Sequence, residues 1–203
     1  FSWTPDPSRW GAARTYSDLQ IPGSGDDAAL HNTSGAIAIV ESMNADLPVC
    51  KDTVREGLAS TELSGRIQVL PGGIEQMFDV AHNPAAIANL AAFIDKRHPV
   101  RRNLAVFSML KDKDLAEVVR LMGSRITSWH LTQLDGSRAT PLQDLADVVS
   151  NHSNSDIKMW PNPLHAYKMA MQLAHPGDRV VVFGSFYLVG AILKSVSGHP
   201  LQV

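Results

Sequence analysis

The stretch EQMFDVAHNPAAIANL, residues 75 to 90, combines the two kinds of element from which most of this chain is built. It begins with a strand-like apolar run that ends abruptly in three polar residues, Asp79, His82 and Asn83. A helix is expected from Pro84, because proline suits the first turn of a helix. Apolar residues then recur at helical spacing, at Ile87, Leu90, Ala91 and Ile94. A buried strand therefore leads directly into a helix, with polar groups at the turn.

The same alternation of strand and helix continues toward the C-terminal end. Further strands are expected at RIQVL (66–70), NLAVFSM (103–109), ITSWHLT (126–132), IKMW (157–160) and RVVVFGS (179–185). Further helices are expected over 112–122, from 140, from 162 to about 174, and from 186 to about 196. The helix from 140 has capping-box spacing in Thr140-Pro141-Leu142-Gln143. Pro71-Gly72-Gly73 predicts a hairpin between the first two strands.

These strands are continuously apolar rather than alternating, which indicates that helices bury both of their faces. The pattern predicts an α/β fold: a Rossmann-like, doubly wound, mostly parallel sheet with a β-hairpin at its start. Ligands of such sheets bind beyond the carboxyl ends of the strands. Three polar segments are expected there, at 79–83, 108–114 and 184–186.

The N-terminal part has a different character. Residues 1–30 are expected to be irregular or to form short edge strands. A helix is expected from Asn32, with an inward stripe at Ala36, Ile39, Val40 and Met43. A second, short helix over 51–59 would turn Val54 and Leu58 inward. Leu63-Ser64-Gly65-Arg66 then predicts a joint, which divides the chain into residues 1–63 and 64–203.

The composition excludes several classes of protein. The chain has 203 residues, 44% hydrophobic and 19% charged, and its net charge of -2 gives no general basic field for nucleic acid or an anionic membrane. Its single cysteine, Cys50, excludes an internal disulfide framework and a cysteine-built zinc site. No apolar run approaches the roughly 20 residues of a membrane span. No initiating methionine is present, so a piece of a longer protein is expected.

Residue chemistry leaves two interpretations open for each candidate at the carboxyl edge. Asp79 suits a sugar hydroxyl, a histidine or a metal-bound water, but Asp and Asn also cap helices. The charged run 111–114 can shape the site or simply begin a helix. Ser185 lies where a hydroxyl and a backbone amide can meet an anion, or where a tight turn enters a helix. Arg66 can reach a phosphate across the joint or lie on the surface, and Asn32 can be a helix cap.

Absent motifs narrow the chemistry further. The chain has no G-x-x-x-x-G-K-[ST] loop, no G-x-G-x-x-G fingerprint and no G-x-S-x-G elbow. Its eight histidines show no metal-ligand spacing, so no metal ligand is predicted within it. Residue physics alone therefore predicts an α/β domain with an anion- or nucleotide-facing edge.

Four motifs, in their order and spacing, resemble one family. They are LSGR (63–66), DVAHNP (79–84), MLKDKD (109–114) and GSFY (184–187). Together they are similar to the C-terminal part of folylpolyglutamate synthase and of the bifunctional dihydrofolate synthase–folylpolyglutamate synthases, which are ATP-dependent Mur-type ligases. The resemblance covers most of the chain, residues 19 to 196, although Ser64 stands where the family usually has proline.

The resemblance implies that residues 1–63 are the tail of a central ATPase domain and that 64–203 are the complete C-terminal domain. It implies a reaction in which ATP phosphorylates the carboxylate of folate or dihydropteroate, and L-glutamate attacks the acyl phosphate. Such enzymes need Mg²⁺ and usually a monovalent cation, whose ligands are expected mainly outside this chain. Because the phosphate loop is absent, the chain alone is expected to be inactive.

The resemblance also assigns roles to five residues. Asn32 matches an asparagine that contacts adenine, although Asn-Thr-Ser replaces the more usual Asn-Ala-Ala. Arg66 matches a hinge arginine that reaches the ATP phosphates, where a guanidinium would stabilise developing charge. Asp79 matches an aspartate that contacts ATP. His82 and Ser185 resemble positions where the incoming glutamate docks, and Arg66 and His82 are the expected catalytic residues.

Two alternatives remain open at this point. One is another Mur-type amino-acid ligase, such as a cell-wall peptide ligase, although the MLKDKD motif favours the folate branch. The other is a non-catalytic nucleotide-binding or interaction domain. For the ligase we expect a cytoplasmic monomer without a nucleic-acid or membrane partner. The N-terminal ATPase half of the same protein would be the partner of this domain.

Overall fold

The computed structural model describes residues 1–6, 8, 14–23, 27–61 and 63–196. The chain divides into two compact units, Phe1–Leu63 and Ser64–Val203. Each unit has its own buried apolar cluster. Among the described residues, no helix combines the length and apolar character that crossing a bilayer requires.

The first unit contains two described helices, α2 (Asp27–Met43) and α3 (Lys51–Ser60). Its buried cluster is formed by Tyr16, Leu19 and Ile37, and Val54 and Leu58 of α3 pack against it as expected. Trp3 and Tyr16 form an isolated antiparallel bridge in the region expected to be irregular or to form short edge strands. Residues 7, 9–13 and 24–26 of that region lie outside the described part of the chain.

The prediction for α2 is wrong in two respects. The helix begins before Asn32, so Asn32 is an exposed residue within the helix and not its cap. The helix turns Thr33 and Ile37 inward, whereas Ile39 and Met43 of the expected inward stripe are 62% and 46% exposed. Apolar residues surround much of this helix, so spacing alone did not identify the side that packs.

A buried carboxylate ties α2 to the segment before it. Glu41 accepts hydrogen bonds from the Arg14 guanidinium at 2.7 Å and from the Tyr16 hydroxyl at 2.5 Å. Burial acts to raise the pKa of Glu41, but the hydrogen bonds from Arg14 and Tyr16 outweigh it and lower that pKa to about 2. Burial, followed by the hydrogen bond to Glu41, raises the pKa of Tyr16 to about 12.

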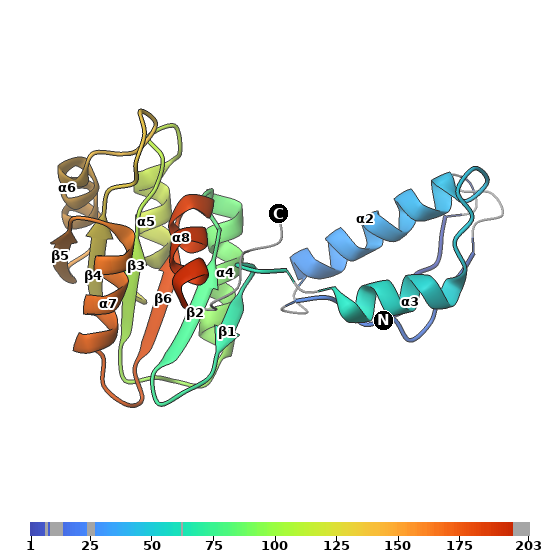
Figure 1. Ribbon diagram of the computed structural model, residues 1–203, viewed down its shortest axis with the longest axis horizontal. Coiled ribbons are helices and arrows are strands. Elements are labelled where there is room, and N and C mark those ends of the chain that lie inside the picture. Colours follow the sequence, from blue (N-terminus) through green and yellow to red (C-terminus); the bar gives the residue numbers. More distant parts are fainter. Residues whose placement is uncertain (7, 9–13, 24–26, 62, 197–203) are drawn as a thin grey trace. The chain divides into compact units, whose positions relative to one another are not determined.

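The second unit is built on a six-stranded sheet of order β1-β2-β6-β3-β4-β5 (Figure 1). The strands are β1 (Gln68–Leu70), β2 (Glu75–Asp79), β3 (Asn103–Phe107), β4 (Ser128–Thr132), β5 (Asp156–Trp160) and β6 (Arg179–Phe183). Only β1 runs antiparallel to its neighbour, with which it forms the expected hairpin, and all other pairs are parallel. The predicted mostly parallel fold is therefore confirmed.

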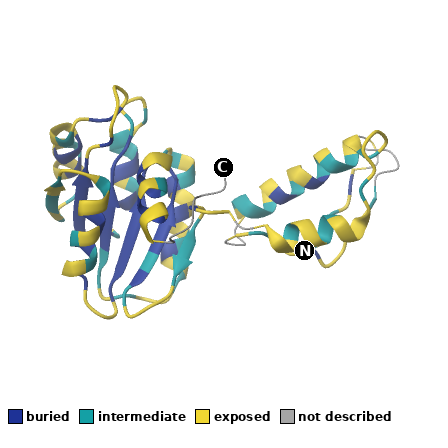
Figure 2. Cartoon of the chain, in the orientation of Figure 1, coloured by how far each residue is buried: buried dark blue, intermediate teal, exposed yellow. Residues whose placement is uncertain are grey.

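Helices cover both faces of this sheet (Figure 1). They are α4 (Pro84–Lys96), α5 (Leu115–Gly123), α6 (Leu142–His152), α7 (Pro163–Leu173) and α8 (Phe186–Val196). The first three contribute to one buried cluster, and α7 and α8 contribute to the other. Figure 2 shows the central strands β2, β6, β3 and β4 mainly in the buried colour and the outer sides of the helices exposed, as expected for a doubly wound sheet. The edge strands β1 and β5 are less buried.

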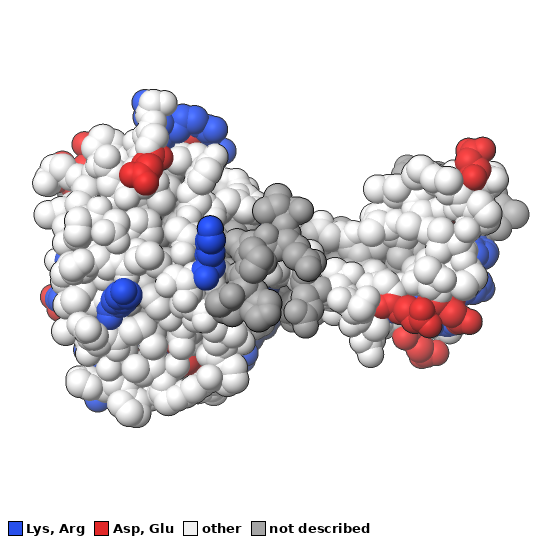
Figure 3. Space-filling view, viewed as in Figure 1, with Lys and Arg blue, Asp and Glu red and all other residues white. Residues whose placement is uncertain are grey.

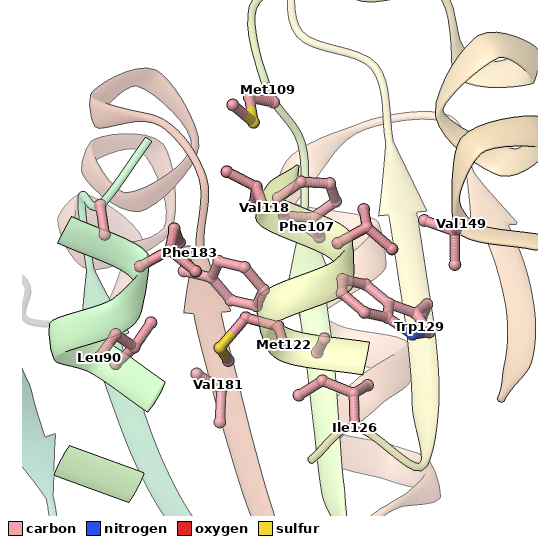
Figure 4. Packing of buried hydrophobic residues seen from close by; sticks show 14 of the residues in the cluster. Leu90, Phe107, Met109, Val118, Met122, Ile126, Trp129, Val149, Val181 and Phe183 are labelled. Atoms are coloured by element: carbon pink, nitrogen blue, oxygen red, sulfur yellow. The ribbon is translucent and has the colours of Figure 1, made fainter. Parts of the chain in front are cut away.

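Aromatic side chains fill the centre of the first cluster (Figure 4). The ring of Phe107 lies 5.0 Å from that of Phe183 and 5.4 Å from that of Trp129, measured between centroids. These separations lie in the range that favours tilted and edge-to-face pairs. Side-chain packing therefore joins the adjacent strands β6, β3 and β4 in addition to their backbone hydrogen bonds.

Side chains cap the starts of three helices in this unit. Asn83, Asp114 and Asn162 accept backbone amide hydrogens at the starts of α4, α5 and α7. The capping box predicted from Thr140 is wrong, because Pro141 occupies the N-cap and makes no side-chain cap bond. The Thr140 hydroxyl is instead buried and lacks a partner among the described residues.

Charge is sparse on the face that carries α7 and α8. Figure 3 shows basic side chains that stand apart over these helices, separated by uncharged surface. This face therefore presents no continuous field of one sign.

His130 is a buried titratable group in the middle of β4. It is fully buried, and its Nδ1 accepts a hydrogen bond from the Trp160 indole at 3.1 Å. Protonation would convert this acceptor into a donor and would place a charge in the core. Burial, with a smaller contribution from Lys158, lowers the pKa of His130 to about 4 from an ordinary value of 6.5.

This shift predicts a loss of stability in mild acid. Between the unfolded pKa and the lowered folded one, the unfolded chain binds a proton at residue 130 and the folded chain does not. The free energy of unfolding should therefore fall by about 2 kcal/mol between pH 7.5 and pH 5. Urea unfolding measured across this range checks it. His130→Phe should flatten the dependence, whereas His152→Gln, at an exposed position, should keep it. Parallel pH profiles for wild type and His130→Phe would contradict the assignment.

Candidate functional site

The candidate site lies at the carboxyl edge of the sheet in the Ser64–Val203 unit. Asp79 at the end of β2 is in register with Phe183 of β6, which is in turn in register with Phe107 of β3. The segments that follow these strands, 80–83, 184–187 and 108–114, therefore leave the sheet side by side. Parallel strands bring their carboxyl ends to one edge, where ligands of such folds bind. The three polar segments are placed as predicted.

Asp79 is buried, with 5% of its surface exposed. Its Oδ1 accepts the amide hydrogen of Ala81 at 2.6 Å, and its Oδ2 accepts that of Ile67 at 3.0 Å. Ile67 has a φ of 44°, which is rare for a β-branched residue and needs support from its surroundings. The carboxylate therefore fixes the backbone next to Arg66. It does not cap α4, because Asn83 does so by accepting the amide hydrogen of the third helical residue.

Arg66 and His82 both contact the same aromatic ring, that of Phe186. The Arg66 guanidinium carbon lies 5.5 Å from the centroid of the Phe186 ring, and the His82 ring centroid lies 5.5 Å from it as well. Phe186 is 55% exposed, so the ring is a platform at the surface rather than part of the core. Within the described part of the chain, Arg66 makes no hydrogen bond or ion pair. Its guanidinium therefore keeps its donors available for an anion.

The backbone determines which nitrogen of His82 carries hydrogen. Its Nδ1 lies 2.9 Å from the carbonyl oxygen of Val80. A carbonyl can only accept, so Nδ1 is the donor and the lone pair of the neutral ring is on Nε2. Neutral His82 can thus accept a proton at Nε2, and it can donate there only when protonated.

Ser185 joins β6 to α8. Its hydroxyl oxygen accepts the amide hydrogen of Tyr187 at 3.1 Å, while its own hydrogen remains available to a ligand. Capping and ligand binding are therefore compatible at this residue. Gly184 before it has a φ of 110°, and a Cβ atom there would lie 2.5 Å from the Ser108 carbonyl oxygen. Only glycine lets this turn run so close to the end of β3.

A cavity of about 150 Å³ lies beside His82, Ser185 and Phe186. It is lined by His82, Leu110, Lys113, Arg138, Gly184, Ser185, Phe186 and Tyr187. Arg138 and Lys113 both contact Asp112, at 3.0 Å and 3.4 Å, so the trio carries one net positive charge. The Arg138 guanidinium is the main cause that holds the pKa of Asp112 below its ordinary value. The cavity is thus lined by both basic and aromatic side chains.

Arg138 was missed in the sequence. It belongs to the loop after β4, and backbone bonds hold that loop against the segment after β3, with the Lys111 amide donating to the Arg138 carbonyl at 3.0 Å. The available signal was its position, because loops that follow parallel strands reach the same edge. Nothing in its own neighbourhood, DGSR, distinguishes it from a surface turn.

Asn32, the fifth predicted site residue, lies on α2 in the other unit, where it is exposed. Among the described residues, no bonding partner defines a role for it. Among the described residues, no group of three or more His, Cys, Asp or Glu side chains could hold a metal ion.

Comparisons with known proteins identify the family of this domain. Residues 65–186 match the family model described as Mur ligase, glutamate ligase domain. The dihydrofolate synthase/folylpolyglutamate synthase of Escherichia coli (strain K12) is 31% identical over 166 residues, which are 82% of this chain and 38% of that protein.

Two solved structures are similar in fold and in sequence. That of E. coli FolC in complex with DHPP and ADP matches with a TM-score of 0.74 and 28% identity, over 91% of this chain and 42% of that one. That of a bifunctional folylpolyglutamate synthase/dihydrofolate synthase with Mn, AMPPNP and L-glutamate bound matches at 0.72 and 26%, over 92% and 43%. The chain thus spans 38% to 43% of the length of these relatives.

The geometry of Asp79 predicts a structural cost on its removal. Asp79→Ala leaves two backbone amides without their acceptor, at about 1.5–3 kcal/mol for each bond to a charged group. We expect the free energy of unfolding to fall by about 3 kcal/mol or more, measured by urea unfolding. Asp112→Ala is the matched control, because it breaks only exposed ion pairs at the same edge and should cost under about 1 kcal/mol. Equal midpoints for the two variants would show that Asp79 does not hold this turn.

Proposed function

The chain belongs to the Mur ligase family through its glutamate ligase domain, and from this premise we propose that it is the C-terminal part of an ATP-dependent folylpolyglutamate synthase. The proposed enzyme joins L-glutamate to folate, and to dihydropteroate where the enzyme is bifunctional. Residues 64–203 form its glutamate ligase domain, and residues 1–63 are the end of its central ATPase domain. The ATPase half of the same protein is the partner of this domain.

Besides the family match, one structural observation supports the proposal. Arg66 and His82 come from two segments of the chain and both contact the Phe186 ring, and His82, Ser185 and Phe186 line one basic cavity. The group combines an anion-binding guanidinium, a base with a defined lone pair and a hydroxyl donor. These are the groups that a reaction between an acyl phosphate and an amine requires.

His82 is proposed to act on the amine. The amino group of glutamate is protonated near neutral pH and must lose a proton before it attacks the acyl phosphate. The bond from Nδ1 to the Val80 carbonyl leaves the lone pair on Nε2, as a general base requires. This refines the expectation that His82 binds glutamate, because the neutral ring cannot donate a hydrogen bond from Nε2.

The basic side chains that line the cavity are proposed to hold the carboxylates of glutamate. Lys113 and Arg138 supply the positive charge, and the Ser185 hydroxyl and the amino-terminal end of α8 supply further donors. A dicarboxylic amino acid matches a cavity that offers several donors. Asp112 sets the geometry of both basic side chains and reduces their net charge.

Arg66 is proposed to act on the phosphate groups. The Phe186 ring holds its guanidinium by a cation–π contact, which uses no hydrogen-bond donor. All its donors can then stabilise the charge that develops in phosphoryl transfer. Asp79 contributes by fixing the backbone beside Arg66, and we propose nucleotide contacts for Asp79 and Asn32 as well. Mg²⁺ and a monovalent cation would be held by other residues of the longer protein.

Phosphate release by the complete polypeptide tests the proposal. It should depend on ATP, on L-glutamate and on folate or dihydropteroate together, and the present chain alone should release none. In the complete enzyme, Arg66→Ala should lower kcat by roughly 10³-fold or more, as for arginines that assist phosphoryl transfer elsewhere. Arg120→Ala, an exposed arginine paired with Glu117 on α5, is the control and should retain full turnover. Phosphate release that does not depend on glutamate would refute the proposed function itself.

Two substitutions at His82 distinguish the roles of its two ring nitrogens. His82→Asn retains a donor close to the position of Nδ1 and removes Nε2, so it should lower kcat by roughly 10²- to 10⁴-fold. His82→Gln places an amide near the position of Nε2 that can hydrogen-bond but cannot take a proton, so it should be equally impaired. Hydroxylamine is neutral at neutral pH and needs no base, so it should restore turnover of both variants by acting as the nucleophile in place of glutamate. If His82→Gln keeps wild-type kcat, the residue only hydrogen-bonds glutamate.

A further inference from the structure

A second cavity lies at the opposite edge of the same sheet. Its volume is about 380 Å³, and its walls include Asn103 at the start of β3 and Arg179 at the start of β6. These two residues are in register with each other, and Arg179 is in register with Glu75 at the start of β2. The cavity therefore opens at the amino ends of the strands. It shares no residue with the candidate site.

Positive charge is concentrated around this cavity. Five arginines line it, at 97, 101, 102, 125 and 179. Three carboxylates pair with them: Glu75 with Arg97 and Arg179, Asp178 with Arg102, and Asp95 with Arg125. Five guanidinium groups against three carboxylates leave an excess of two positive charges, in a chain whose net charge is -2.

The arginine donors also outnumber their acceptors. Arg101 is exposed, and its side chain has no hydrogen-bond or ion-pair partner among the described residues. The Nε of Arg97 is enclosed and likewise lacks a partner there. Arg179 is almost wholly buried, yet beyond Glu75 its guanidinium reaches only the Asn103 side chain at 3.4 Å and the His98 carbonyl at 3.3 Å. Buried donors normally find an acceptor.

A phosphate group is the ligand that satisfies this arrangement. Guanidinium groups bind tetrahedral oxyanions through paired N–H donors and stay charged at all relevant pH values. The hydroxyls of Ser124 and Thr127, which also line the cavity, add neutral donors at its wall. A single carboxylate would leave one of the two excess positive charges uncompensated, whereas a phosphate group carries up to two negative charges.

We propose that this cavity is a second anion site, which binds a phosphate group either as the free ion or as part of a nucleotide. The site is independent of the proposed ligase reaction. Arg101 contributes the unpaired guanidinium, and Arg97 and Arg179 form the fixed floor that Glu75 holds in place.

Isothermal titration of the complete 203-residue chain tests this site without any measurement of turnover. The probes are orthophosphate, pyrophosphate and ADP, at an ionic strength held constant with chloride. We expect saturable binding that Arg101→Ala weakens about tenfold, the effect of losing one charged hydrogen bond. Arg120→Ala should bind as the wild type does. Since the Arg101 side chain is exposed and makes no hydrogen bond or ion pair among the described residues, its removal should leave the fold intact, which a melting curve checks.

The three probes distinguish the sources of the phosphate. Orthophosphate that binds as tightly as ADP supports a site for the free ion, and tighter binding of ADP supports a nucleotide. Because ADP can also reach the candidate site, Arg66→Ala is titrated in parallel. If Arg66→Ala abolishes the binding and Arg101→Ala leaves it unchanged, the proposal is wrong. The absence of saturable binding for every probe, or equal losses in Arg101→Ala and Arg120→Ala, would also overturn it.

Discussion

The insertion of β6 between β2 and β3 is the constraint on which the rest of the structure depends. This strand comes last in the chain, yet it pairs in parallel with a neighbour on each side. Its alternate side chains enter opposite cores, with Val181 and Phe183 on one face and Val180 and Val182 on the other. Neither core is complete until this strand is in place, so its two faces link the helices of both layers.

The same strand determines where chemistry can take place. Its carboxyl end delivers Gly184 and Ser185 beside the end of β2, where Asp79 fixes the turn that carries Arg66. Its amino end delivers Arg179 beside Glu75, in the arginine-lined cavity. One strand register thus sets both the candidate site and the second cavity, at opposite edges of the sheet. A shift of one residue would misplace both and would also exchange the two cores.

Much of the fold could be predicted, because segments with a strong periodic pattern adopt the predicted helix or strand in the folded domain. The helix from Pro84 buries the four residues expected of it, and the hairpin and the parallel strands appear where the apolar runs lie. The predictions that were wrong concern positions where a local sequence signal competes with tertiary packing. Ile39 and Met43 lie on α2, whose packed side is decided by Tyr16 from a distant segment. Thr140 has capping-box spacing, but the loop between β4 and α6 buries its hydroxyl away from the helix start.

The sequence by itself determined the order of the elements, the helix starts at Asn83 and Asn162, and the polar segments that end β2 and β6. These depend on neighbouring residues, whose spacing is visible in the chain. Only the tertiary structure decided that Arg66 and His82 both contact Phe186, that Arg138 lines the same cavity as His82, and that five arginines gather at the other edge. Such groupings depend on strand order, and strand order is set by non-local packing of both faces of the sheet.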